Sequence, residues 1–169
     1  MGNESAETGE REWISAPLHC WDIFMDSYYR RMALAGDRQK LEQLSTRNTW
    51  NLKWDMGDKL LNQGKVILVT DPSLHIIFAS SNITAMNGYH VEEVIGNYPR
   101  MFQGEATTDT ARQHIRKAVQ AREKFEVSLI NYKKSGELYH CRIEGYPLFN
   151  RKKEVVNFIA FETAGVYQN

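Results

Sequence analysis

The protein has 169 residues, of which 42% are hydrophobic and 25% are charged, close to the globular average, so wholesale disorder is excluded. The 21 Lys and Arg residues balance the 21 Asp and Glu residues, and the formal net charge is zero. Without a cationic surplus the chain has no global field to hold a phosphate backbone, so we expect no nucleic-acid partner.

The N-terminal residues 1–12 are polar and acidic, which predicts a disordered tail and is unlike the basic, then apolar start of a signal peptide. No apolar run approaches the roughly 20 residues that a bilayer span requires. The two cysteines, Cys20 and Cys141, have no partner at metal-ligand spacing, and reduced thiols are typical of the cytoplasm. We therefore expect a soluble cytoplasmic protein that does not bind membranes.

Residues 13–64 are predicted to form a helical extension. Its first apolar stripe has the spacing of an amphipathic helix and consists of Trp21, Phe24, Met25, Tyr28 and Met32. We expect Gly36 and Asp37 to end this helix and to begin a short second one, with a third helix near residues 49–61. Helices of this kind cannot bury their stripes alone, so the extension should pack on the next domain or on a second subunit.

After Gly64 the hydrophobic period changes to two, which indicates strands. The pattern predicts five strands, at residues 66–70, 75–80, 124–133, 137–149 and 155–163. Between the second and third strands it predicts several short helices and one longer helix over 108–121. Tight turns at 134–136 and 150–153 join the last three strands as hairpins.

This order predicts an α+β fold with one five-stranded antiparallel sheet, because consecutive strands joined by tight turns pair antiparallel. The short helices should lie on one face of the sheet, and the gap between helices and sheet is the usual place for a small ligand. The outward positions Ile130 and Tyr132 are apolar, so we expect the N-terminal extension or a second subunit to cover the other face.

The element order and several motifs resemble the PAS domain family, and within it the light-oxygen-voltage (LOV) flavin photoreceptors. The motifs are Val-Thr-Asp at 69–71, Asn-Gly-Tyr at 87–89, Glu-Glu-Val-Ile-Gly at 92–96, Arg-Met-Phe-Gln-Gly at 100–104 and Ile-Asn-Tyr-Lys-Lys-Ser-Gly at 130–136. The resemblance implies a PAS-like domain over residues 65–164, followed by a short tail at 165–169.

LOV domains carry the motif Gly-x-Asn-Cys-Arg-Phe-Leu-Gln, whose cysteine sulfur adds to the excited flavin. The matching stretch here is Gly-Asn-Tyr-Pro-Arg-Met-Phe-Gln at residues 96–103, so Tyr98 and Pro99 replace the asparagine and the cysteine. Since residue 99 has no thiol, the resemblance implies that no cysteinyl adduct forms and that the photocycle typical of the family is absent.

The resemblance also implies which residues would contact a flavin-like ligand: Arg100, Gln103, Arg116, Asn131, Cys141 and Glu162. The two arginines match phosphate contacts, for which a planar guanidinium fork is suited. Cys141 replaces a ring-contacting asparagine and Glu162 replaces the signalling glutamine. Because these ring contacts differ, we favour an empty or differently occupied pocket, with flavin mononucleotide as the alternative ligand.

Strand alternation places Glu162 on the face of Phe158 and Ala160, pointing into the domain. Burial raises the pKa of a carboxyl unless a cation or a donor compensates. Three alternatives stay open for this side chain: contact with a ligand, an ion pair with a pocket arginine, or a position at the strand end in water.

The other polar residues near this pocket have simpler interpretations. Arg112 and Arg116 are four residues apart on the long helix and could form a solvated face with Glu105 or Asp109. Gln103 in the family also holds helix to sheet, so its presence is consistent with a purely architectural role.

We expect neither a metal site nor an active site. The five histidines are scattered over different elements and no pair is four residues apart, so haem ligation by His114 has little support. His140 and Cys141 are adjacent on a strand and should point to opposite faces, which prevents a nucleophile–base pair.

The sequence therefore predicts a non-catalytic PAS sensory or protein-interaction module, homodimeric through its N-terminal helices and the sheet face. Its output should pass to a separate signalling protein, since no kinase or DNA-binding signature follows the domain. The alternative is a flavin-binding redox or light sensor that works without adduct formation. A small enzyme that uses the pocket lacks any residue that could be named as nucleophile or base.

Overall fold

The computed structural model describes residues 19–51 and 55–165. The predicted tail at residues 1–12 and residues 166–169 lie outside these ranges. None of the helices in the described ranges combines the length and the apolarity of a membrane span.

The N-terminal extension begins with one continuous helix, α1, at His19–Arg47. The expected break at Gly36 is wrong: Gly36 does not adopt the left-handed conformation that ends helices. The helix continues because Leu34, Leu41 and Leu44 lie on one face and pack together against the sheet. Asp37 caps no second helix, and instead its carboxylate accepts a hydrogen bond from the Ser81 backbone N–H at 2.6 Å.

The segment after α1 returns along the sheet. Asn51 donates its backbone N–H to the carbonyl of Phe149 at 3.0 Å. The predicted third helix is shorter than expected, because helical conformation is found only from residue 56 and includes the π-helical turn η1, Asp58–Asn62; residues 52–54 lie outside the described ranges.

The predicted sheet is confirmed, with five strands in the order β2-β1-β5-β4-β3 and every pair antiparallel. The strands are β1 Val66–Thr70, β2 Ile76–Ala79, β3 Phe125–Tyr132, β4 Leu138–Phe149 and β5 Val155–Gly165. Both predicted hairpins are present, since β3, β4 and β5 are neighbours in chain order. β5 is the central strand, and the rest of the chain packs on both faces of the sheet around it.

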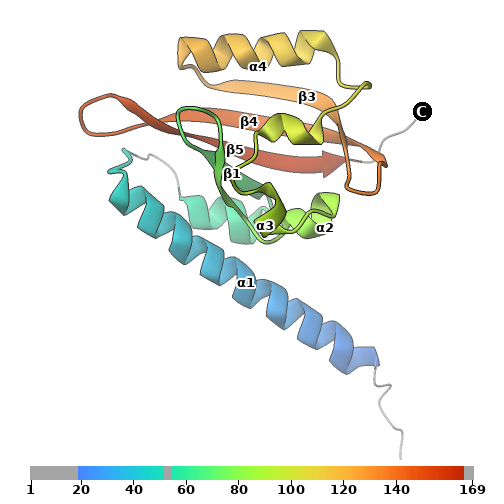
Figure 1. The fold of residues 1–169 in the computed structure, drawn as a ribbon. Coiled ribbons are helices and arrows are strands. Elements are labelled where there is room, and N and C mark those ends of the chain that lie inside the picture. Colours follow the sequence, from blue (N-terminus) through green and yellow to red (C-terminus); the bar gives the residue numbers. More distant parts are fainter. Residues whose placement is uncertain (1–18, 52–54, 166–169) are drawn as a thin grey trace, which may run out of the picture.

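Four short elements cross between β2 and β3 and cover one face of the sheet (Figure 1). They are α2 Ile83–Asn87, α3 Val91–Val94, the 3₁₀ turn η2 Pro99–Phe102 and α4 Asp109–Ala121. Thr108 caps α4, because its hydroxyl accepts a hydrogen bond from the Ala111 N–H at 3.3 Å. We call the sheet face under these elements the inner face.

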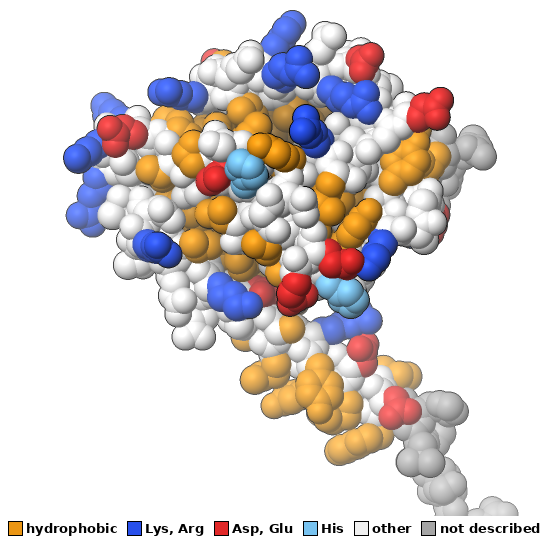
Figure 2. Space-filling view, in the orientation of Figure 1, with side chains coloured by type: hydrophobic (Ala, Val, Ile, Leu, Met, Phe, Trp, Pro, Cys, Tyr) orange, Lys and Arg blue, Asp and Glu red, His pale blue; other side chains and the backbone are white. Residues whose placement is uncertain are grey.

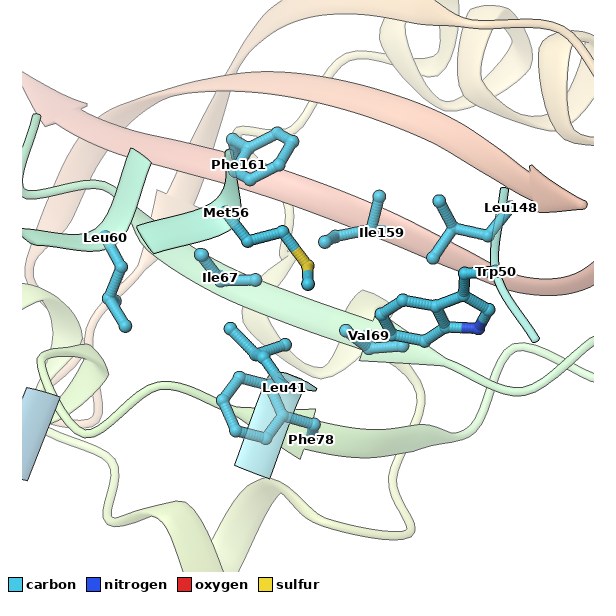
Figure 3. Close-up of a cluster of buried hydrophobic side chains, with 10 residues drawn as sticks. All are labelled: Leu41, Trp50, Met56, Leu60, Ile67, Val69, Phe78, Leu148, Ile159 and Phe161. Atoms are coloured by element: carbon cyan, nitrogen blue, oxygen red, sulfur yellow. The ribbon is translucent and has the colours of Figure 1, made fainter. Parts of the chain in front are cut away.

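The N-terminal extension covers the outer face of β1, β2 and β5 (Figure 3). The buried cluster there consists of Leu41, Trp50, Met56, Leu60, Ile67, Val69, Phe78, Leu148, Ile159 and Phe161. The sequence predicted that this extension or a second subunit would cover Ile130 and Tyr132; for Tyr132 the structure shows the loop after η2 instead, and a second subunit over Ile130 stays a prediction. Tyr132 lies at the sheet edge, where its ring occupies the space beside Gly104 and its hydroxyl accepts the Ala106 N–H at 2.9 Å.

The N-terminal half of α1 extends beyond the body of the domain, and apolar side chains gather on it (Figure 2). Exposed large residues there are Trp21, Ile23, Phe24, Tyr28, Tyr29 and Met32, with Trp21 65% and Phe24 60% exposed. Met32 and Leu34 are two positions apart, roughly 200° around the helix. The helix therefore has two apolar faces, one towards the sheet and one directed away from it.

Candidate ligand site

A cavity of about 790 Å³ lies between the inner face of the sheet and the helices η2 and α4. This volume is within the range of small-ligand sites, which is roughly 300–1,000 Å³. Its floor is formed by residues of four strands and includes Thr70, Asn131, Ile143, Gly145 and Glu162. Five of the six predicted ligand contacts line it: Arg100, Gln103, Arg116, Asn131 and Glu162. Cys141 does not.

Pro99 lies in the wall of this cavity at the first position of η2, where proline is favoured because a helix start leaves its N–H unused anyway. The rim beside it is a stack of three side chains. The ring of Tyr98 lies 4.4 Å from the ring of His75, and the guanidinium of Arg100 lies 4.9 Å from the Tyr98 ring. No sequence motif indicates this stack.

Two exposed guanidinium groups line the rim of the cavity, those of Arg100 and Arg116. Within the described ranges neither forms an ion pair. Arg112 is different, because its three nitrogens bind Asp109 at 3.0 Å, the carbonyl of Gly104 at 2.6 Å and the amide oxygen of Gln103 at 3.3 Å. Arg112 is thus a structural tie between α4 and the loop after η2, whereas Arg100 and Arg116 are placed to meet an anionic ligand.

The floor of the cavity holds buried polar atoms without partners. Asn131 is 2% exposed, and its Oδ1 has no hydrogen bond in the described structure. Thr70 is 6% exposed, and its Oγ1 is likewise unpaired. Such atoms are costly in a folded protein unless a ligand or an ordered water satisfies them. Their position on the floor favours a ligand with hydrogen-bonding groups at its buried end.

Glu162 points into the domain, as strand alternation predicted, and only 3% of it is exposed. Of the three alternatives, the position in water is excluded by this burial. The ion pair is also absent, since no described cation lies within 4.0 Å of the carboxylate. The thiol of Cys141 instead donates to Oε2 of Glu162 at 3.6 Å.

The electrostatics of this acid follow from its burial. Loss of hydration raises the pKa of Glu162 to about 7, and the hydrogen bond from Cys141 opposes that rise. Burial, and next the nearby Glu162 charge, raise the pKa of the Cys141 thiol well above its usual value. The thiol therefore stays protonated and acts as a donor.

Two further polar residues extend this group, and the sequence analysis missed them as site residues. Tyr139 pairs directly with Asn131 across the β3–β4 ladder, and Asn87 from α2 is fully buried nearby. The Tyr139 hydroxyl and the Asn87 Nδ2 have no partner in the described structure. Burial is the main cause that raises the pKa of Tyr139. The hairpin register predicted at 134–136 was the available signal for Tyr139, since it sets residue 139 opposite residue 131.

None of the described histidines lines the cavity. His114 is exposed on α4, and no group of three potential metal ligands occurs within the described residues. His140 is exposed whereas Cys141 is buried, so the two point to opposite faces as predicted.

A sheet of this topology with a ligand-sized cavity under crossing helices is an architecture that can hold a small ligand inside the domain. The family model for the PAS domain matches residues 64–163, which is more than half of the chain. The chain belongs to the PAS domain family.

Among the proteins similar to this chain are ones whose names refer to LOV domains or to blue light. The chain is 37% identical over 98 residues to the protein TWIN LOV 1 of Arabidopsis thaliana, and 32% identical over 97 residues to a blue-light-activated histidine kinase of Brucella canis. Each match covers 56% of this chain but only 25% and 20% of the respective relative, so the chain corresponds to a small part of these longer proteins.

Solved structures of LOV domains share this fold. A LOV domain studied with a flavin analogue is 26% identical and superimposes with a TM-score of 0.62, covering 67% of this chain and 86% of the other. The light state of the Aureochrome1 LOV domain is 26% identical with a TM-score of 0.58, covering 63% of this chain and 87% of the other.

Proposed function

We propose that the protein is a non-catalytic sensory module in which a small ligand in the cavity biases the arrangement of the N-terminal extension. The observation that carries this proposal is that one strand serves both sites. In β5, Ala160 and Glu162 line the cavity, while Phe161 belongs to the buried cluster under the extension and Asn157 binds Trp50 of the extension. A ligand that binds two arrangements of the extension unequally shifts their populations.

We infer that the signalling unit is a homodimer in which the outward face of α1 packs against a second copy. The three rings of Trp21, Phe24 and Tyr28 would bury roughly 350 Å² per copy, estimated from their exposure and from typical aromatic burial. A stable interface buries about 800 Å² per partner, so these rings supply a large share. The charges on this half do not oppose pairing, because Asp22 and Asp26 balance Arg30 and Arg31.

Matched variants on the two sides of α1 test the dimer. Phe24→Asp places a charge in the outward stripe, and sedimentation velocity should show a monomer. Ile23→Asp adds the same charge at another exposed position, about 100° around the helix from Phe24 and on the side of Leu34, and should leave the dimer intact. An equal effect of the two substitutions, or none from either, would contradict this interface.

The output of the module is proposed to act on a separate signalling protein. Among the relatives, the matched region is one part of a longer chain that the name describes as a histidine kinase. We further propose that no cysteinyl–flavin photocycle operates, because the cavity wall carries Pro99 where the resemblance places the reactive cysteine.

A second function, flavin binding without adduct formation, is favoured by the unpaired polar atoms of the floor together with the rim cations. Arg100 and Arg116 would hold a phosphate, and Asn131 would accept a hydrogen bond from the ring. A flavin, when bound, supplies a chromophore and a redox centre. This function explains the similarity to proteins whose names refer to blue light.

The purified protein tests this second function. A yellow protein with a blue-light absorption band would support it. Arg116→Gln should then weaken binding of riboflavin 5′-phosphate by about 10- to 100-fold, as expected for a charge-assisted hydrogen bond, and leave riboflavin binding unchanged. A colourless protein that binds neither compound would reject it and leave the first proposal standing.

A further inference from the structure

The floor of the cavity contains an acid in an unusual setting. Glu162 is 3% exposed, and its cross-strand neighbours are the apolar residues Val66 on β1 and Ile143 on β4. Its side chain faces the cavity, and the Cys141 thiol on the same face of β4 donates to it. This carboxyl accepts one weak hydrogen bond, and it forms no ion pair with a cation of the described residues.

The surroundings of Glu162 on every packed element are uncharged or distant. On β4 the ionisable neighbours are Cys141 and Tyr139, and both remain protonated because burial raises the pKa of each. On β3 the nearest polar wall residue is the neutral Asn131, and on β1 the residues that face the cavity are Leu68 and Thr70.

Among the described residues that line the cavity, the cationic ones are Arg100 on η2 and Arg112 and Arg116 on α4, across the cavity from the sheet. Arg112 is already bound to Asp109 and Gln103, while Arg100 and Arg116 are exposed. The negative charge of ionised Glu162 therefore has no nearby cation to offset its lost hydration, whereas the neutral form fits the apolar floor.

We propose that Glu162 is a proton switch built into the cavity floor, which donates a hydrogen bond to the ligand when protonated and accepts one from Cys141 when ionised. The ligand class that fits the protonated state is a molecule that presents an uncharged carbonyl acceptor to the floor, whatever charge it carries at the rim. This selectivity rests on the proposed function of the cavity as a ligand site. The switch itself is a property of the empty protein.

Burial supports this switch, since it raises the pKa of Glu162 to about 7. A ligand that fills the cavity removes the remaining water from the carboxyl and favours the neutral form further. By linkage such a ligand binds with uptake of one proton, so its affinity falls as the pH rises above the pKa of the empty protein, by up to tenfold per pH unit.

Infrared spectroscopy of the unliganded full chain during a pH titration tests the switch. The wild type should show a carbonyl band of a protonated carboxylic acid that disappears with a midpoint that reports a pKa of about 7. This band should be absent in Glu162→Gln. The S–H band of Cys141 should shift with the same midpoint, because the thiol donates more strongly to a carboxylate than to the acid.

Variants of the thiol give an independent arm if Glu162→Gln fails to fold. Cys141→Ala removes the donor that stabilises the carboxylate and should raise the midpoint, and Cys141→Ser restores a donor and should return it towards the wild-type value. A wild-type carboxylic acid band that has already vanished above about pH 5 would overturn the proposal. These readouts need neither a ligand nor a dimer, so they fail or succeed independently of the proposed function.

Discussion

The indole N–H of Trp50 donates to Oδ1 of Asn157 at 2.8 Å, and this bond joins the N-terminal extension to the central strand β5. The amide of Asn157 then donates to the carbonyl of Thr70 on β1 at 2.9 Å. Since Thr70 also lines the cavity, a short chain of hydrogen bonds connects the extension to the cavity floor.

Trp50→Phe should destabilise the protein by about 1–3 kcal/mol, because it leaves the buried Oδ1 of Asn157 without its donor. Urea denaturation at a fixed protein concentration measures the change. A double-mutant cycle with Asn157→Ala separates the bond between the two side chains from the other effects of the smaller ring. A coupling energy of zero between the two substitutions would mean that the bond contributes nothing.

Gly36→Ala should stabilise the protein by about 1 kcal/mol, since glycine is a poor residue within a helix and an added Cβ would meet nothing within 4 Å. Urea denaturation followed by circular dichroism gives the value. A loss of stability would indicate that α1 is interrupted at this residue, as the sequence alone had suggested.

Gly145→Ala should destabilise the protein by about 1–3 kcal/mol, because the ring of Phe125 already occupies the space that a Cβ would need. Phe125 and Gly145 are register partners on β3 and β4, and both line the cavity. Replacing the ring by a smaller side chain, with Phe125→Leu in the Gly145→Ala background, should recover part of the lost stability. Purely additive changes in a double-mutant cycle would show that the two residues are not coupled.

The stability of the protein should depend on the protonation of Glu162. Its pKa is raised from 4.5 to about 7 in the folded chain, so between these values the folded state holds a proton that the unfolded state has released. The free energy of unfolding should therefore fall as the pH rises through this window, by about 3 kcal/mol in total, and then level off.

Denaturation of the wild type and of Glu162→Gln between about pH 5 and about pH 8 isolates this contribution, because the other titrating groups are common to both proteins. The variant should lose this part of the slope. Parallel curves for the two proteins would show that the carboxyl titrates at an ordinary pKa in the folded state.

Strand periodicity was sufficient to predict the sheet and the inward direction of Glu162, because each depends on local alternation and tight turns. The course of α1 was not predictable in the same way. Gly36 is a local signal for a helix end, but Leu34 and Leu41 bury on one face only if the helix continues. Tertiary packing thus overrides the local preference.

The candidate site was predictable where a motif marks it and not where partners come from distant segments. Arg100 and Asn131 were identified from sequence motifs, and both line the cavity. The bond between Asp37 and the Ser81 backbone joins residues 44 positions apart, and no pattern in the sequence indicates it. The thiol donor to Glu162 likewise depends on the diagonal neighbours that the β4–β5 register creates.

The outward apolar face of α1 gives the account its most direct test, because a second copy is the proposed cover for it. Light scattering of the full chain during size-exclusion chromatography measures the molar mass in solution. We predict a mass of twice 19.6 kDa at micromolar concentration. A mass of 19.6 kDa that persists as the concentration is raised would contradict the dimer and the signalling role assigned to α1.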